Sequence, residues 1–179
     1  MRERQSRRAQ ERLRRRYRPD DVRVLFVGES PPASGRFFYL QDSGLYRAVL
    51  ETFQRVDASI DHTNFLSVFA GTGCYLVDLC AEPVDRLEPA PRRAACRAGE
   101  AVLARTITRL RPPMIVSVVR SIERNVNRAA LGACSRGEIL RLPYPGRWQR
   151  SRAAFCDELA PTVRELLRPR AAAFTPEFL

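Results

Sequence analysis

The chain has 179 residues, of which 45% are hydrophobic, and a formal net charge of +11 at pH 7. This length allows one domain with a hydrophobic core and is too short for two comfortable ones. No apolar run approaches the roughly 18 residues that cross a bilayer, and no apolar segment follows the N-terminal arginines as it would in a secretory signal. We therefore expect a cytoplasmic protein without a membrane partner.

The positive charge is uneven along the chain. All 31 basic residues are arginine, and residues 1–19 contain nine of them beside two glutamates. We interpret residues 1–19 as a basic arm that can be helical, residues 20–168 as the domain and residues 169–179 as a C-terminal tail. The charge favours an anionic partner, nucleic acid first, and the arm would attract phosphates without reading sequence. The alternative is a solvated helix or tail.

A strand, a loop and a helix open the domain. Residues 22–28, VRVLFVG, have the short apolar pattern of a buried parallel strand that ends at Gly28. Apolar residues then recur at helical spacing over residues 43–56, which predicts an amphipathic helix. Either Asp42 or Ser43 suits its N-cap.

Strands and helices alternate through the rest of the chain, although residues 61–73 are ambiguous. Strands are predicted over residues 74–80, 114–119 and 137–146, the last running into a turn, and helices over residues 92–111, 121–132 and 150–167. This order predicts an α/β fold, a three-layer α/β/α sandwich around a four-stranded parallel sheet. Ligands of such sheets bind beyond the carboxyl ends of the strands. The loops over residues 28–39, 78–83 and 142–148 should converge there.

The first of these loops carries candidate site residues. Glu29 directly follows a strand, so its carboxylate suits a base or a water-holding group, or else it caps nearby backbone N–H groups. Pro31 and Pro32 stiffen the loop. The three aromatics at 37–39 either form a flat slot that stacks a planar base or close the end of the core. The only histidine, His62, is more typical of a structural residue than of a catalytic one.

Several of these segments together resemble a known family. The stretch VLFVGESPPASGRFFYLQDSGLYRAVL resembles the first motif of the uracil-DNA glycosylase superfamily, with the closest likeness to its iron-sulfur branches. YLVDLCAEPVDRLEP resembles the middle strand of that superfamily, and LPYPGRW lies where its last motif falls. The likeness spans most of residues 22–167. It implies cleavage of the N-glycosidic bond of a base that has been flipped out of DNA.

The resemblance also implies roles for individual residues. Phe38 matches the aromatic that stacks on the base, Glu29 matches the acidic position that activates water, and Asp42 is a second catalytic candidate. The remaining implied contacts to the base are Gly28, Ser30, Pro31, Tyr39 and Asp78, and those to DNA are Tyr144, Arg147 and Trp148.

The departures from the family pattern alter the expected chemistry. Leu142 stands where many relatives have a histidine that donates to the base, so Arg147, Tyr144, Trp148 or backbone N–H groups would have to replace it. Asp78 stands near the Asn position that reads the base edge. It is either shifted from that position, changes the base preference, or acts while protonated, because a carboxylate accepts hydrogen bonds but does not donate them.

The cofactor and the reaction type follow from the cysteines and the missing lysines. Cys80 and Cys96 keep the spacing of one cysteine pair of the iron-sulfur branches, but no cysteine precedes Cys74, so we expect no cluster, metal or other cofactor. No lysine is present to form a Schiff base, so a monofunctional enzyme that uses water is expected.

The sequence thus predicts a monomeric DNA repair glycosylase that removes uracil or another deaminated or damaged base. Two alternatives remain open. One is a catalytically silent nucleic-acid-binding relative, and the other is a hydrolase of free nucleosides or nucleotides.

Overall fold

The structure, a computed structural model, describes residues 2–146 and 148–168. Its centre is a four-stranded sheet with the strand order β2-β1-β3-β4, and every neighbouring pair is parallel. The strands are β1 (Val24–Gly28), β2 (Cys74–Asp78), β3 (Met114–Ser117) and β4 (Glu138–Arg141). The predicted α/β class with a four-stranded parallel sheet is therefore confirmed.

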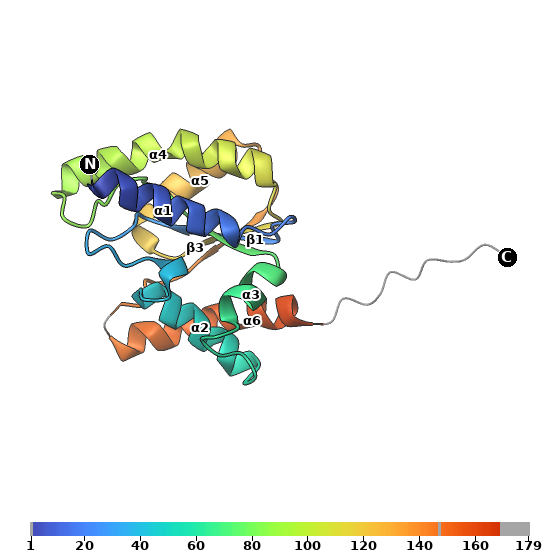
Figure 1. The fold of residues 1–179 in the computed structure, drawn as a ribbon. Helices are drawn as coiled ribbons and strands as arrows, with labels where there is room; N and C mark the ends of the chain where they lie inside the picture. Colours follow the sequence, from blue (N-terminus) through green and yellow to red (C-terminus); the bar gives the residue numbers. More distant parts are fainter. Residues whose placement is uncertain (1, 147, 169–179) are drawn as a thin grey trace.

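Helices cover both faces of the sheet, as Figure 1 shows. One face carries α1 (Arg2–Arg16), α4 (Pro89–Leu110) and α5 (Glu123–Gly132), and the other carries α2 (Gly44–Val56), α3 (Phe65–Gly71) and α6 (Gln149–Leu167). Two 3-10 turns, η1 (Phe38–Leu40) and η2 (Arg120–Ile122), complete the order. This is the expected three-layer sandwich. No helix in the described part of the chain has the length and apolar character needed to span a bilayer.

Element boundaries differ from the predicted ones for local chemical reasons. The ambiguous stretch contains the short helix α3. Helix α4 begins three residues earlier than predicted, because proline is well tolerated at the first helical position and Pro89 occupies it. Ser43, rather than Asp42, caps α2: its Oγ accepts a hydrogen bond from the backbone N–H of Tyr46 at 3.1 Å. Pro161 lies inside α6 without ending it.

The core lies on both faces of β1, all of whose residues are buried. On the α2 and α3 side, a cluster of phenylalanines fills the space between sheet and helices. Its members Phe26, Phe53, Phe65 and Phe69 are fully buried. Ring centroids within the cluster are 5.3 to 6.1 Å apart in tilted or edge-to-face arrangements, which aromatic rings prefer. The carboxyl end of β1 is therefore held by a rigid core.

Helix α1, which the sequence suggested to be an arm ahead of the domain, lies against the domain. Leu13 and Tyr17 pack on the core, and the Tyr17 ring stacks on Tyr39 at a centroid distance of 5.8 Å. The helix runs beside α4 on the same face of the sheet (Figure 1), and the two helices line a common groove. Part of the basic segment is thus packed against the domain.

Candidate functional site

A cavity of about 440 Å³ lies at the carboxyl edge of the sheet. All four strands contribute to its lining through residues at or beyond their ends: Gly28 at the end of β1, Asp78 at the end of β2, Val118 directly after β3 and Tyr144 three residues beyond β4. The loop after β1 supplies the largest share of the lining, including Glu29, Ser30, Pro31, Pro32 and Phe38. The structure therefore brings together at one site the loops that the sequence placed at this edge.

Backbone contacts hold the first loop against the segment that follows β2. The N–H groups of Leu79 and Cys80 donate to the carbonyl oxygens of Gly28 and Glu29, both at 2.8 Å, so the ladder between β1 and β2 continues past the strands. Ser30 Oγ accepts from the N–H of Val84 at 3.2 Å. Because these bonds use backbone groups on both sides, the base of the cavity is well fixed.

Further along, the same loop is held by a carboxylate. Asp85 accepts a hydrogen bond from the N–H of Ala33 at 3.1 Å. Gly35 then has a φ of +81°, which glycine adopts without strain. The chain can therefore turn back toward Phe38.

Glu29 has an ion-pair partner that the sequence did not suggest. Arg92, in the first turn of α4, donates from Nε to Glu29 Oε1 at 2.8 Å and from Nη2 to Oε2. The Glu29 side chain is only 14% exposed. A two-point guanidinium–carboxylate pair has a defined orientation. Glu29 thus presents a fixed negative charge at the cavity, and Arg92, which also lines it, presents a fixed positive one.

Phe38 lines the cavity and is nonetheless a core residue, with 3% of its surface exposed. Its ring contacts Tyr39 and Phe69 at centroid distances of 5.2 Å and Tyr46 at 5.7 Å. These neighbours prevent the ring from rotating away. Phe38 therefore closes the end of the core, as one of the two alternatives held, and it also lines the cavity.

Tyr39 and Asp42, two other predicted site residues, lie outside the cavity lining. Tyr39 is 2% exposed, and its hydroxyl donates to the carbonyl of Leu76 at 3.1 Å and accepts from the N–H of Leu76 at 2.8 Å. Burial raises the pKa of Tyr39 well above its ordinary value. Asp42 Oδ1 accepts from the N–H of Phe37 at 2.7 Å. The Tyr39 side chain thus binds the backbone of β2 and the Asp42 side chain that of Phe37, so the observed contacts of both are structural.

Asp78 is the second carboxylate at the cavity and has its own arginine. Its side chain is 10% exposed, and Oδ2 accepts a short hydrogen bond from Arg14 Nη2 of α1. Burial raises the pKa of Asp78, and the Arg14 guanidinium acts in the opposite direction. In the register of the sheet, Asp78 faces Gly28, and a Cβ at Gly28 would lie 2.9 Å from Asp78 Oδ1. Glycine is therefore required beside this carboxylate.

The segment after β4, which reaches the cavity rim at Tyr144, carries two exposed aromatic residues. Tyr144 is 55% exposed and lines the cavity, and Trp148 is 78% exposed but does not line it. Arg147, a predicted DNA contact, lies outside the described residues. Leu142 is fully buried, and His62 is exposed on a loop away from the cavity lining. No histidine is therefore present at this site in the described part of the chain.

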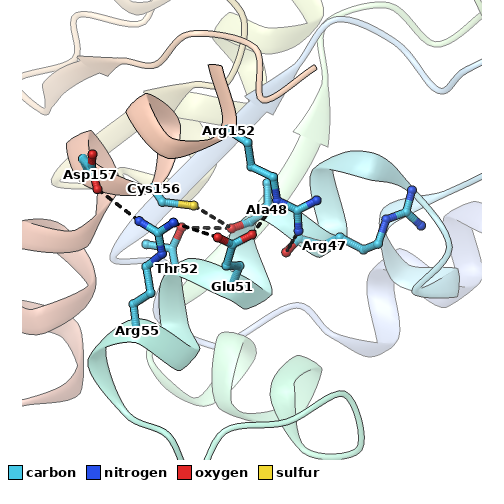
Figure 2. Close-up of polar contacts among 8 residues, drawn as sticks. All are labelled: Arg47, Ala48, Glu51, Thr52, Arg55, Arg152, Cys156 and Asp157. Carbon is cyan, nitrogen blue, oxygen red and sulfur yellow. Dashed lines mark hydrogen bonds and ion pairs between the residues drawn. The ribbon is translucent and has the colours of Figure 1, made fainter. Parts of the chain in front are cut away.

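A group of ion pairs, the α2–α6 network, anchors the helix that follows this rim. Arg152 pairs with Glu51, and Arg55 donates to Glu51 at 2.8 Å and to Asp157 at 3.0 Å (Figure 2). Figure 2 also shows the Arg152 guanidinium at the carbonyl of Arg47, at 3.1 Å. Arg152 lies one turn after Trp148, so the network fixes the start of α6 and with it the end of the rim segment.

The cysteines do not fit an iron-sulfur cluster. Cys80 and Cys96 have their sulfur atoms 3.7 Å apart behind Glu29, but Cys74 is bonded to Thr72 and Cys156 to the carbonyl of Ala48. A four-cysteine cluster needs two further thiolates beside the first pair. No group of three or more residues suited to bind a metal ion occurs in residues 2–146 and 148–168.

Sequence reasoning missed the two arginines that pair with the site carboxylates. Arg92 was predicted to begin a helix and Arg14 to belong to a basic arm. Neither arginine belongs to a recognisable motif. In a chain with 31 arginines, residue type alone does not indicate which of them pair with the site carboxylates. A weak signal exists for α1, because Arg7, Gln10, Arg14 and Tyr17 recur at spacings of three and four, which places them on one face of a helix.

The chain was also compared with known proteins. No protein-family model matches it, and no curated protein does either.

Proposed function

We propose that the chain is a monofunctional DNA glycosylase that removes uracil or another deaminated or damaged base with water as the nucleophile. The observation that carries the proposal is the cavity at the carboxyl edge of the sheet, where Phe38, Glu29 and Asp78 meet. Its volume of about 440 Å³ is in the range of small-molecule sites. The resemblance of residues 22–167 to uracil-DNA glycosylases supports the same activity.

Binding of the base would use one apolar and one polar contact. A flipped base would stack on the cavity-facing surface of Phe38, a contact that contributes roughly 1–3 kcal/mol per base. Asp78 Oδ1 would accept a hydrogen bond from an N–H group on the edge of the base. The exposed Tyr144 and Arg36, which line the cavity, and the exposed Trp148, four residues after Tyr144, would contact the surrounding DNA strand.

Bond cleavage would depend on the fixed charges of the Glu29–Arg92 pair. The sugar develops positive charge as the N-glycosidic bond breaks, and the Glu29 carboxylate would stabilise that charge and orient water. The base leaves as an anion, and Arg92 uses only Nε and Nη2 for Glu29, so its Nη1 group could donate to that anion. Arg92 would then take the part that the absent histidine plays in relatives.

A catalytically silent DNA-binding protein is the second candidate. It is favoured by the engagement of both Glu29 oxygens with Arg92, which leaves fewer lone pairs for water. It is favoured also by the apolar Leu142, which is fully buried.

Base release from labelled oligonucleotides tests the proposal directly. Single and double strands carrying uracil, hypoxanthine, xanthine or adducted cytosine are incubated with the protein and then cleaved with alkali at abasic sites. Release of one base supports the proposal. Retained DNA binding without release of any base supports the silent protein instead.

Two variants with matched controls test the roles within the site. Phe38→Leu should weaken base binding, whereas Phe69→Leu, in the same cluster but outside the cavity lining, should not. Glu29→Gln should slow single-turnover release by about a hundredfold or more, the usual contribution of an acid–base group. The control is Glu88→Gln. Glu88 is exposed and precedes α4, near Arg92, and its substitution should leave the rate of base release unchanged. If Phe69→Leu weakened base binding as much as Phe38→Leu, the role of Phe38 would be contradicted. If Glu88→Gln slowed release as much as Glu29→Gln, the role of Glu29 would be contradicted.

A further inference from the structure

Helix α1 contacts the site at several successive turns. Arg7 pairs with Glu82 after β2, and Gln10 donates to the carbonyl of Gly35 at 3.4 Å. Arg14 pairs with Asp78, and Tyr17 stacks on Tyr39. The partners lie in the loop after β1 and at the end of β2, which are the two segments that build the cavity. Among these partners Asp78 lines the cavity itself, and the other three belong to the adjoining segments.

Arg14 is the central contact of this helix face and is largely buried. Its side chain is 16% exposed, its Nη1 donates to Glu11 at 2.9 Å, and its guanidinium lies 5.2 Å from the centre of the Phe37 ring. The carboxylates of Asp78 and Glu11 raise the pKa of Arg14 even though burial acts to lower it. The residue therefore remains a cation at any pH at which the protein is folded.

The two oxygens of Asp78 have different surroundings. Oδ2 is bound to Arg14, on the side of α1. Oδ1 lies on the side of Gly28, which lines the cavity, and no donor in the described residues is bonded to it. One oxygen is thus fixed by α1, and the other is available to a ligand.

We propose that Arg14 is a positioning residue of this site: by binding Oδ2 it holds the Asp78 side chain in place and orients Oδ1 as a hydrogen-bond acceptor, so that the cavity prefers bases with an N–H group on that edge. This inference rests on the proposed function for the identity of the ligand as a nucleobase. With Oδ2 bound to Arg14, Oδ1 can accept a hydrogen bond from an N–H group on the base.

The ionisable groups that interact with Asp78 come from three parts of the chain, namely Arg14 and Glu11 of α1, Tyr39 of η1 and Cys80 after β2. Burial raises the pKa values of Tyr39 and Cys80, so neither group ionises in the acidic range. Glu11 is the only other carboxyl group among them, and Glu11→Gln therefore controls for its titration.

The first test measures the charge of Asp78 without any need for activity. The full chain is labelled with 13C at the aspartate carboxyl carbon, and the Asp78 signal is assigned by its loss in Asp78→Asn. In Arg14→Met the titration midpoint of Asp78 should move to higher pH, because the compensating cation is gone. Arg14→Lys should restore part of the shift. Arg15→Met removes a neighbouring arginine that is 72% exposed and also pairs with Glu11, and it should change nothing.

The second test uses base release and its dependence on pH. Arg14→Met should reduce release by about ten- to a hundredfold, as misplaced site groups do, and should move the acidic limb of the pH profile upward. A double variant covers the case in which Arg14→Met alone destabilises the fold. In the Asp78→Asn background the charge that Arg14 binds is already absent, so Arg14→Met should have little further effect on base release.

The outcomes separate the two proposals. A titration midpoint that does not respond to Arg14→Met overturns the positioning role. A shifted midpoint with unchanged release and unchanged base preference also overturns it. If the wild-type protein releases no base, the proposed glycosylase fails, and the titration still shows whether Arg14 controls the charge of Asp78.

Discussion

The hydroxyl of Tyr39 offers the sharpest test of how the site is supported. Strand β2 is at the edge of the sheet, so half of its backbone groups have no neighbouring strand. The N–H and C=O groups of Leu76 are two of these, and the Tyr39 hydroxyl bonds both, at 2.8 and 3.1 Å. One phenol thus serves as the missing strand partner at the middle of β2, two residues before Asp78.

Tyr39→Phe should therefore lower the free energy of unfolding substantially. Each buried polar group that loses its partner costs about 1–3 kcal/mol, so two groups on one residue give about 2–6 kcal/mol in total. Tyr39 is 2% exposed, which leaves little access for water to replace the hydroxyl. Because burial raises the pKa of Tyr39, the hydroxyl keeps its proton and its donor function at neutral and moderately alkaline pH.

Urea unfolding followed by circular dichroism measures this loss as a change in midpoint at constant slope. Tyr46→Phe is the matched control, because its hydroxyl makes part-buried contacts to Gln41 Oε1 at 3.1 Å and to the carbonyl of His62 at 3.4 Å and bonds no strand backbone; the expected loss is about 1 kcal/mol. Equal losses for the two variants, or a neutral Tyr39→Phe, would refute the view that this hydroxyl completes the edge of β2.

Three further predictions concern packing, thiol reactivity and pH. Gly99→Ala should lower the free energy of unfolding by about 1–3 kcal/mol, because its Cβ would lie 2.2 Å from the carbonyl oxygen of Leu79. Gly71→Ala is the control, since a Cβ there would meet nothing within 4 Å and no such loss is expected. In native protein a thiol reagent should modify the exposed Cys134 far faster than Cys74 and Cys80. Those two thiols are buried, and burial raises their pKa values to about 12. Equal rates of modification would contradict this packing. Glu51→Gln should lower stability by roughly 0.5–1 kcal/mol at pH 7. Hydrogen bonds from Arg55 and Arg152 lower the pKa of Glu51 although burial acts to raise it, so the stability that this carboxylate contributes is present above the pKa of an unfolded glutamate. That contribution disappears as pH falls through the folded pKa; a difference between variant and wild type that persists in acid would exclude the α2–α6 network as its source (Figure 2).

The sequence by itself determined the order of elements and the place of the site. Periodicity is a local property, so the apolar run at residues 22–28 and the amphipathic pattern at residues 43–56 predicted β1 and α2 within a few residues. Alternation of strands and helices then required a parallel sheet, and a parallel sheet places the ends of all strands at one edge. The positions of Gly28, Glu29 and Asp78 at the cavity follow from that rule.

Only the tertiary structure decided which groups surround those residues. Arg92 is 63 residues from Glu29 and Arg14 is 64 residues from Asp78, and no local pattern links such pairs. Tyr39 looked like a base contact because three aromatics occur in a row, but its hydroxyl meets an unpaired strand edge that exists only in the assembled sheet. The basic segment before β1 likewise showed only its charge in the sequence. The face of α1 that packs on the domain consists mainly of polar residues, and hydrophobic periodicity does not detect such a face. The position of α1 beside the cavity therefore depends on its partners on β2 and the first loop, which only the tertiary structure brings together.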